Sequence, residues 1–526
     1  MKIKSVAFNK GIQYPAKLGT IVLKPTAEGK ASYAQNIDVS NDEYGNSVVV
    51  PGPALTTIGS NSELTGVPIV RQAFNESATP RGLLYIGQGT LGTKTTFRRI
   101  KDILSGSTPV IDTSFTDGVV DHSSHTNLQI VDVVYRPDSS LNFFLYFTIK
   151  DDTDTVVYKF SASDSNPNVD ASVIATNNNF TGGYTDQFLV FSSYDNNIYW
   201  IGRNRVDSIN TSDTHTPNAL ALGLPLGTFA SCGADWQQQL VVAFTNAAYG
   251  GFAQRKIGGR AGIAIWDYVS PGIIRNVPAP CRYISALVPS PDGNLLVFGG
   301  VDEGKSSIYA FTGYGFTLLH QYIGDLPRSR HSVEFDSQGR ILFQTVEGQF
   351  CRYDRTTGVF EHLDSMTTGS SAGGILAKGI GSPTGNEFFI ASGTGSTYTL
   401  KKVQFGSYIG DDNSASDTVT TPLVISGVQS MQALSVIQAI TLPLSKPLAT
   451  GERVELRVYK NGSTTDYTTY LTMDYSTDGA ISSKREVLTI SDINSYNLAV
   501  VWKQADGLST APPVLPALVE EENIYG

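Results

Sequence analysis

Residues 282–300 read RYISALVPSPDGNLLVFGG, and residues 330–348 read RHSVEFDSQGRILFQTVEG. In each segment an apolar run, a tight turn and a second apolar run follow one another. The turns, Pro291-Asp292-Gly293-Asn294 and Ser337-Gln338-Gly339, contain the glycine that a hairpin turn with a positive φ requires. Each segment therefore predicts a β-hairpin.

The same pattern continues after each hairpin. Residues 306–322 (SSIYAFTGYGFTLLHQY) and 349–363 (QFCRYDRTTGVFEHL) each predict a third strand, a second turn and a short outer strand. Four antiparallel strands in sequence make one blade, and a single blade cannot bury both of its faces. Repeated blades bury them by stacking around a central axis. The sequence therefore predicts an all-β fold with a β-propeller at its centre.

The repeat can be followed along most of the chain. Strand openings recur at intervals of roughly 45 to 58 residues, which is typical of propeller blades. This spacing predicts six or seven blades. The openings lie near Gly82, Leu128, Asp186, Asp235, Tyr283, His331 and Gly374.

The chain outside the repeat is predicted to form four further segments. Residues 1–75 contain many turn formers and predict an N-terminal extended strap, ahead of a β-propeller over 76–406. Residues 407–422 predict a polar linker. Short alternating runs separated by Asn-Gly and Asp-Gly turns predict a C-terminal β-sandwich over 423–512. Residues 513–526, with their prolines and glutamates, predict an extended C-terminal arm.

The composition narrows the classes of function. The 526 residues include 38 basic and 48 acidic side chains, which gives a net charge of −10, so we expect no specific nucleic acid as a partner. No segment approaches the roughly 18 uninterrupted apolar residues of a membrane span. The first residues, MKIKSVAFNKGIQYP, lack the apolar core of a signal peptide, so we expect the protein to be made in a cytoplasm.

The segment Tyr33–Gly59, YAQNIDVSNDEYGNSVVVPGPALTTIG, contains an Asn-Ile-Asp-Val strand, a turn with glycine and a Val-Val-Pro-Gly-Pro run. It resembles the N-terminal strap of phage structural proteins, in which similar short sequence motifs precede a β-propeller in tail, nozzle or tail-tip components. The alternative is an ordinary edge strand ended by proline, because proline cannot donate to a strand ladder. The resemblance implies a structural protein of the phage virion, located in the tail.

Residues 193–200, Ser-Tyr-Asp-Asn-Asn-Ile-Tyr-Trp, partly resemble the aspartate box of sialidase-type propellers, S-x-D-x-G-x-T-W. Asn197 replaces its glycine and Tyr199 replaces its threonine. An aspartate box is a hairpin turn pinned by an aspartate side chain, so we expect Asp195 to have a structural role. The motif is weak support for a glycosidase.

Two polar clusters are candidate metal sites. Asp121, His122 and His125 place two imidazoles beside a carboxylate, but Gly118 and the neighbouring serines favour a solvated loop. Asp151-Asp152-Thr153-Asp154 resembles a calcium-binding turn, without the glycine and the distal glutamate of an EF-hand loop. We expect these carboxylates to solvate a hairpin, so we predict neither a metal nor any other cofactor.

A short basic segment is a further candidate contact site, and two cysteines are candidate core residues. Arg328-Ser329-Arg330-His331 precedes one blade and predicts a surface loop with one ion pair, with a contact to a phosphate or to a partner's carboxylate as the alternative. Cys232 and Cys281 are predicted to occupy equivalent buried strand positions in adjacent blades.

No catalytic motif is present in the chain. The sequence has no G-x-S-x-G, H-E-x-x-H, P-loop or dinucleotide-binding fingerprint. Sialidase-like sites, however, are built from residues that lie far apart in sequence. We predict no catalytic residues and no enzyme.

Two functions of different classes agree with these observations. The first is a structural component of a phage tail, in which the propeller is a rigid platform for assembly. The strap and the sandwich would then reach neighbouring subunits in a homo-oligomeric ring, with other virion proteins, tail fibres or portal and adaptor proteins as partners. The alternative is a carbohydrate-binding adhesin or sialidase-like glycosidase of the virion, in which aromatic loops stack on sugar rings during host attachment. We expect the first.

Overall fold

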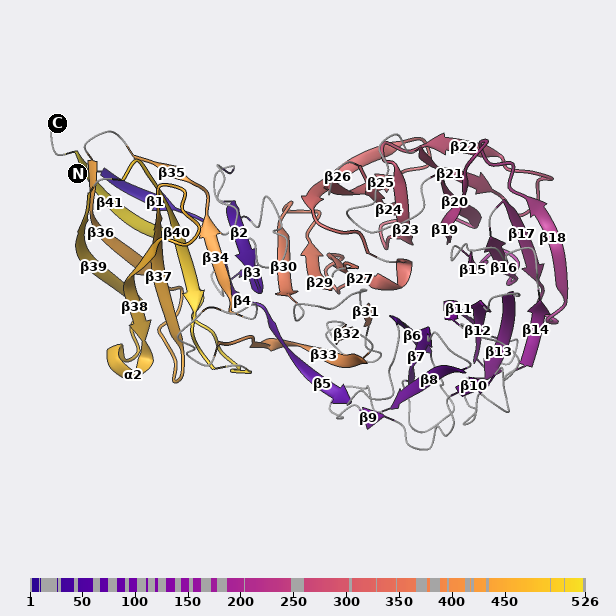
Figure 1. The fold of residues 1–526 in the computed structure, drawn as a ribbon, viewed down its shortest axis with the longest axis horizontal. Coiled ribbons are helices and arrows are strands. Elements are labelled where there is room, and N and C mark those ends of the chain that lie inside the picture. Colours follow the sequence, from indigo (N-terminus) through magenta and orange to yellow (C-terminus); the bar gives the residue numbers. More distant parts are fainter. Residues whose placement is uncertain are drawn as a thin grey trace.

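The computed structural model is all-β, with only short helical turns among the residues it describes (Figure 1). Within those residues, no helix is long and apolar enough to cross a membrane. The structure describes residues 2–8, 31–41, 46–59, 67–73, 83–89, 94–101, 110–111, 119–121, 129–137, 143–150, 155–161, 172–176, 187–202, 204–246, 260–301, 305–327, 329–346, 348–365, 376–378, 388–394, 397–411, 421–431, 435–491, 493–505 and 507–523, together with residues 10, 26, 30 and 417.

The described residues between 53 and 408 form seven antiparallel sheets in succession, six with four strands and one with five. Figure 1 shows them around a common centre, and we refer to them as the ring. The first strands of neighbouring sheets contact one another, β6 with β11, β11 with β15, β15 with β19, β19 with β23, β27 with β31, and β31 with β6.

The strands of the first four sheets are β6 (Val67–Ala73), β7 (Leu83–Gly89), β8 (Lys94–Lys101), β9 (Val110–Ile111) and β10 (Val119–Asp121); β11 (Gln129–Pro137), β12 (Phe143–Lys150), β13 (Thr155–Ser161) and β14 (Ser172–Thr176); β15 (Gln187–Phe191), β16 (Ile198–Gly202), β17 (Arg205–Ile209) and β18 (His215–Ala221); and β19 (Phe229–Trp236), β20 (Gln239–Thr245), β21 (Ala261–Trp266) and β22 (Arg275–Pro278). Those of the last three are β23 (Tyr283–Pro289), β24 (Leu295–Gly300), β25 (Lys305–Phe311) and β26 (Phe316–Ile323); β27 (Val333–Phe335), β28 (Ile341–Gln344), β29 (Gln349–Tyr353) and β30 (Phe360–Ser365); and β31 (Leu376–Lys378), β32 (Phe388–Thr394), β33 (Thr397–Tyr408) and β5 (Pro53–Gly59).

The middle strands of the ring are apolar on both faces because each sheet lies between two others. Every residue of β16 and of β24 is buried. Separate apolar clusters fill the spaces between sheets, with Trp200 between the second and third and Trp236 between the fourth and fifth. Burying one large apolar side chain contributes about 1.5–3 kcal/mol. Contacts between stacked sheets therefore supply much of the stability of the ring.

The two hairpins that the sequence predicts are confirmed. β23 pairs with β24 and β27 with β28, both antiparallel. Gly293 and Gly339 have φ angles of +85° and +75° in the connecting turns. Glycine adopts this left-handed conformation without the steric cost that a Cβ atom brings.

The seventh sheet takes its outer strand from near the N-terminus. β5 pairs antiparallel with β33, and Leu55 lies opposite Val403. Segments from opposite ends of the ring's sequence thus share one sheet.

Two further sheets pack face to face beside the ring, and we refer to them as the paired sheets. They share one apolar core, which includes Leu456, Trp502 and Val519. α2 (Tyr475–Asp478) follows β38. The strands, in spatial order, are β1 (Lys2–Val6), β41 (Ala517–Asn523), β36 (Ser435–Pro443) and β39 (Ser483–Ile490) in one sheet, and β2 (Ala31–Gln35), β34 (Leu423–Ser426), β40 (Ser495–Trp502), β37 (Arg453–Lys460) and β38 (Tyr467–Asp474) in the other, where β35 (Gln429–Ser430) also pairs with β40.

The chain crosses between the ring and the paired sheets twice, and the two crossings are hydrogen-bonded to each other. The first contains the hairpin of β3 (Ile37–Asn41) and β4 (Ser47–Pro51) and enters β5, and the second follows β33. Ile409 N donates to Gly52 O at 2.9 Å. This pairing joins the two bodies by more than a single strand of chain.

Three of the predicted segments differ from the structure. Residues 1–75, predicted to be a strap ahead of the propeller, contribute strands to both bodies. β1 and β2 belong to the paired sheets, and β5 and β6 belong to the ring. The predicted C-terminal arm instead contains β41, which lies between β1 and β36. Buried and exposed side chains alternate in β41, as in a strand with one buried face, but only over a few residues. Ala517 and Val519 are buried, and Leu518 is partly exposed. The described start of the predicted linker is also held, since Asp411 N donates to Gln504 O at 2.7 Å.

Candidate functional site

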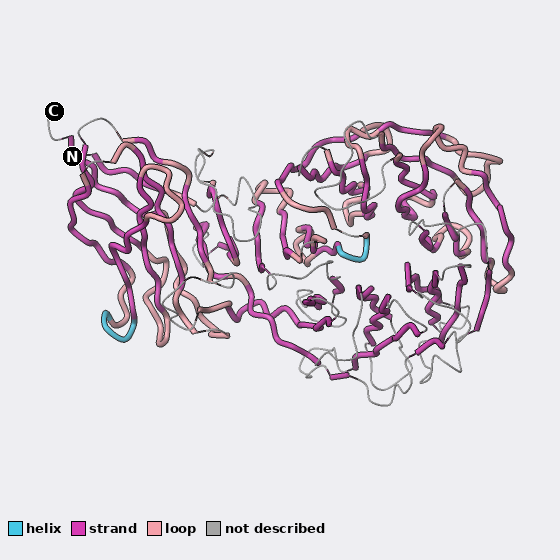
Figure 2. Tube along the Cα trace, viewed as in Figure 1, coloured by secondary structure: helices cyan, strands magenta, loops and turns pink. Residues whose placement is uncertain are grey.

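A buried charge cluster lies on the inner side of the ring. Asp132, at a bulge in β11, accepts hydrogen bonds from Val133 N at 2.9 Å and from Leu189 N at 2.8 Å. It also pairs with His331 Nε2 and, at 3.0 Å, with Arg330 Nη2. Arg330 and His331 belong to the short helix η3 (Arg330–Ser332), which Figure 2 shows on the inner side of the ring.

The cluster connects η3 to several sheets. Arg330 also donates to Leu189 O at 2.5 Å and to Gly233 O at 3.2 Å, in β15 and β19. The side chains of Arg330 and His331 are 18% and 2% exposed. Arg330 and His331, predicted to lie in a surface loop, are therefore largely buried, because a carboxylate far away in sequence faces them; Arg328 of the same run lies outside the described residues.

The Asp132 carboxylate is suited to a structural role. Burial favours a raised pKa, but Arg330, His331 and the hydrogen bonds outweigh it and lower the pKa of Asp132 to about 2. Each of its oxygens accepts two hydrogen bonds. A carboxylate that is ionised and fully hydrogen-bonded anchors its neighbours and is a poor general acid at neutral pH.

A second charge cluster joins the ring to the first crossing. Arg352 in β29 makes two hydrogen bonds to Glu361 in β30 and pairs with Asp38 in β3. Both Arg352 and Glu361 have side chains that are 2% exposed. Burial opposes the charge of Arg352, but the carboxylates of Asp38 and Glu361 raise its pKa overall. Val39 N completes the cluster by donating to Glu361 Oε1 at 2.6 Å.

A cleft of about 380 Å³ lies beside this cluster. It is polar, and most of its charged side chains already pair within the protein, as Asp336 does with Arg340; Asp354 accepts hydrogen bonds from Thr356 N and Thr357 N instead. The charged residues of its lining are Asp38, Asp336, Asp354, Glu361, Arg340 and Arg352.

His362 is buried where the strap meets the ring. Asn36 N donates to His362 Nδ1 at 3.4 Å, and Nε2 has no hydrogen-bond partner among the described residues. Burial lowers the pKa of His362 to about 4. The neutral ring is therefore the form that the folded protein accommodates.

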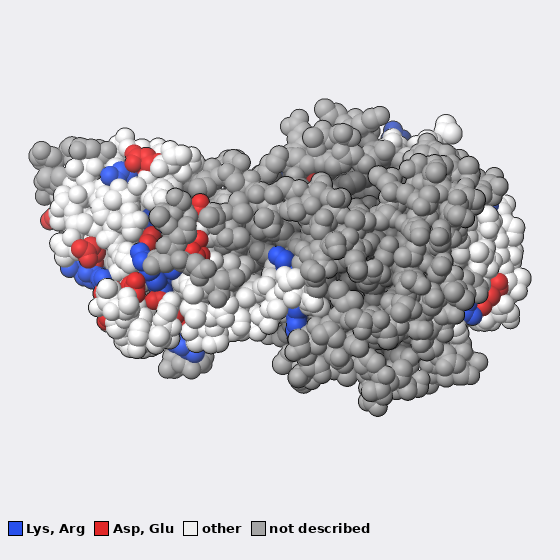
Figure 3. All heavy atoms as spheres, turned by 60° about the horizontal axis from the view of Figure 1, so that its bottom comes forward, with Lys and Arg blue, Asp and Glu red and all other residues white. Residues whose placement is uncertain are grey.

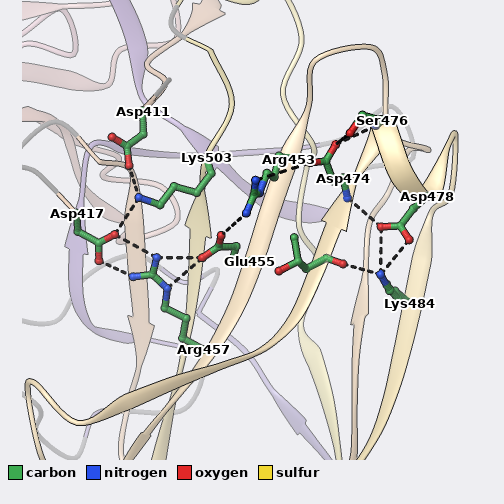
Figure 4. A network of polar contacts seen from close by, with 11 residues as sticks. Asp411, Asp417, Arg453, Glu455, Arg457, Asp474, Ser476, Asp478, Lys484 and Lys503 are labelled. Carbon is green, nitrogen blue, oxygen red and sulfur yellow. Dashed lines mark hydrogen bonds and ion pairs between the residues drawn. The ribbon is translucent and has the colours of Figure 1, made fainter. Parts of the chain in front are cut away.

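A third charge cluster holds the second crossing against the paired sheets (Figure 4). Lys503 pairs with Asp411 and, at 3.0 Å, with Asp417, while Arg457 pairs with Asp417 and with Glu455. The side chains of Lys503 and Asp411 are both 3% exposed. Burial opposes ionisation of Asp417, but Arg457 and Lys503 lower its pKa. Asp411 and Asp417 of the predicted linker are thus structural partners of the paired sheets, while Asp412 lies outside the described residues.

The network continues along the paired sheets toward α2. Arg453 pairs with Glu455 at 3.0 Å and with Asp474 at 3.8 Å. Asp474 caps α2 by accepting a hydrogen bond from Ser476 N at 2.8 Å, and Asp478 pairs with Lys484 at 2.9 Å. Figure 3 shows basic and acidic side chains interspersed over this part of the molecule.

Asp195 has the structural role that its motif predicts. It accepts hydrogen bonds from Asn197 N at 3.1 Å, Asn197 Nδ2 at 2.7 Å and the Tyr199 hydroxyl at 2.6 Å. These contacts pin the turn between β15 and β16. Asn197 and Tyr199 therefore replace the usual residues of the box without loss of the turn.

The candidate metal sites lie mostly outside the described residues, which do not include His122, His125 or 151–154. Within the described part of the chain, no group of three or more His, Cys, Asp and Glu side chains could hold a metal ion. Cys232 and Cys281 are both buried in the apolar cluster between the fourth and fifth sheets. Cys281 precedes β23 rather than lying on a strand, so the two positions are not equivalent.

Comparison with protein-family models and with curated proteins gives no match. Several solved structures align with the chain at low identity. The exo-beta-1,3-galactanase Pc1,3Gal43A of Phanerochaete chrysosporium, with galactose, is 9% identical with a TM-score of 0.33, over 92% of this chain and 100% of that one. The Dos1 propeller is 10% identical with a TM-score of 0.41, over 67% and 95%. Raptor of Chaetomium thermophilum is 11% identical with a TM-score of 0.42, over 67% and 30%.

One expectation is corrected by these comparisons. The sequence predicts no enzyme, and the glycoside hydrolase among the matched structures contradicts that prediction. At a TM-score of 0.33 the match assigns neither an activity nor a substrate to this chain.

Proposed function

We propose that this chain is a structural component of a phage virion, located in the tail as a nozzle, tail-tip or fibre-docking protein, where it is a rigid platform for protein–protein assembly. The phage assignment comes from the resemblance of Tyr33–Gly59 to the straps of phage structural proteins. Its partners in this proposal are other copies in a homo-oligomeric ring, other virion proteins, and tail fibres or portal and adaptor proteins.

We also propose the finer architecture that the platform requires. The seven sheets form a seven-bladed β-propeller that β5 closes, and the paired sheets form a β-sandwich. Closure protects the sheet edges, which would otherwise be free to pair with other chains.

The observation that supports the platform best is the double crossing between the two bodies. Gly52 O accepts a hydrogen bond from Ile409 N, and buried ion pairs hold each crossing, Arg352–Asp38 on the first and Lys503–Asp411 on the second. A rigid platform needs a double connection of this kind, because a single flexible linker would let the ring and the paired sheets rotate independently.

The test uses the full-length purified chain. Mass photometry and negative-stain electron microscopy are expected to show a closed, symmetric oligomer with the two bodies in one fixed arrangement. A monomer whose two bodies take many relative orientations would contradict the proposal.

The alternative function, a carbohydrate-binding adhesin used in host attachment, is supported by one specific observation. Tyr194 is an exposed aromatic side chain of the ring that stacks on Tyr268, whose hydroxyl donates to the carboxylate of Asp235. A monomer that neutral saccharides stabilise against heat would favour this alternative.

A further inference from the structure

Tyr194 lies in the turn between β15 and β16, and 51% of its surface is exposed. Its ring stacks almost parallel to that of Tyr268, with 6.0 Å between centroids and 6° between planes. Tyr268 packs in turn against Tyr199 and Trp266, with centroids 5.0 Å and 5.4 Å away. Tyr194 is therefore an exposed aromatic ring that a buried aromatic cluster holds in place. Its side chain would lose little conformational entropy when a ligand binds.

The residue that supports Tyr194 has a strained backbone. Tyr268 has a φ of +64°, which is rare for a bulky residue. Its hydroxyl donates to Asp235 Oδ1 at 2.6 Å, and Asp235 Oδ2 accepts from Ser193 N at 3.0 Å. Such strain persists where several contacts fix a residue, and it is concentrated at binding sites. Here the contacts fix the Tyr268 ring against Tyr194.

Three aspartates belong to the segments that hold these rings. Asp235 accepts from the Tyr268 hydroxyl, Asp195 follows Tyr194 in sequence, and Asp267 precedes Tyr268. In the described part of the chain they accept hydrogen bonds from neutral groups and form no ion pair. They do not converge on a point that could hold a metal ion. Because each carboxylate oxygen accepts up to two hydrogen bonds, they retain capacity for further donors such as hydroxyl groups.

We infer that Tyr194 is a stacking platform for a neutral hexose unit of a glycan. The C–H groups on one face of a pyranose carry partial positive charge and are attracted to the negative face of an aromatic ring. The sugar hydroxyls donate to the carboxylates, and the same carboxylates repel acidic sugars such as sialic acid. This inference does not depend on the virion assignment, but a symmetric assembly would present several copies and strengthen weak binding through multivalency.

The test is saturation-transfer NMR on the full-length protein with lactose, cellotriose and maltotriose, and with sialyllactose as the anionic comparison. We expect transfer to at least one neutral saccharide and none to the sialic acid ring. Tyr194→Ala should weaken binding about tenfold, and Tyr194→Phe should retain it because the ring remains. Circular dichroism melts establish that both variants are folded.

Tyr314 provides a matched control. It is 90% exposed in the turn between β25 and β26, and its ring contacts Arg275 instead of carboxylates. Tyr314→Ala should leave saccharide binding unchanged. The inference is overturned if no neutral saccharide receives saturation from the wild-type protein, if Tyr194→Ala binds as well as wild type, or if Tyr314→Ala loses binding to the same extent.

Discussion

The ion pair between Lys503 and Asp411 offers the sharpest test of how the second crossing is held. Both side chains are 3% exposed, and Asp411 also accepts a hydrogen bond from the Thr421 hydroxyl at 2.9 Å. In Asp411→Asn the shape is kept and the charge is lost, so the Lys503 ammonium stays buried with less compensation. Breaking a buried pair costs about 3–5 kcal/mol. Because Asp417 remains 3.0 Å from Lys503 Nζ, we expect the lower end, about 3 kcal/mol.

Hydrogen exchange followed by mass spectrometry measures this loss of stability in the individual segments of the chain. Peptides that cover β34 and β40 should exchange roughly 100-fold faster in Asp411→Asn, while peptides that cover β24 in the ring should be unchanged. The double variant Asp411→Asn with Lys503→Met removes the stranded charge, so it should exchange more slowly than Asp411→Asn alone. Equal exchange in wild type and Asp411→Asn, or a double variant that is worse than the single one, would refute the reasoning.

Three other perturbations test the remaining contacts. Gly52→Ala would place a Cβ atom 2.0 Å from Leu363 O, so we expect a loss of about 3 kcal/mol in urea unfolding, whereas Gly272→Ala, with open space around it, should behave as wild type. Asp132→Asn should cost about 3 kcal/mol in the same assay, and Asp292→Asn, which breaks the more exposed pair with Arg355, under about 1 kcal/mol; equal effects would contradict a central role for Asp132. Because burial lowers the pKa of His362 from 6.5 to about 4, its neutral form stabilises the fold fully above pH 6.5, and this contribution is lost as the pH falls toward 4. The loss amounts to about 3 kcal/mol, so His362→Gln should flatten the fall in melting temperature between pH 7 and pH 4.5, and an equally steep fall in the variant would contradict this role of His362.

The sequence predicts the ring more accurately than its surroundings. Near Leu128, Asp186, Tyr283, His331 and Gly374 a first strand begins within two residues of the predicted opening, because apolar runs and turns repeat there. Two openings are misplaced: that near Gly82 precedes β7, the second strand of its sheet, and that near Asp235 lies at the end of β19. The true first strand, β19, reads FASCGADW and has too little alternation to stand out.

The sequence could not predict contacts between residues that lie far apart along the chain. Asp38 meets Arg352, and Asp132 meets Arg330, across separations that no local pattern encodes. The strands β1, β2 and β41 are short, and only their neighbours in the paired sheets make them strands. The role of Asp195 was predictable because a turn is local, and its hydrogen bonds reach residues only two and four positions away.

Electron cryomicroscopy of intact phage particles whose genome encodes this chain is the most direct test of the central claim. We predict several symmetry-related copies around the tail axis, each with its ring and paired sheets in the arrangement of Figure 1. Particles that lack the protein, or that carry it as a single copy without contacts to neighbouring subunits, would show that it is not a structural component of the tail.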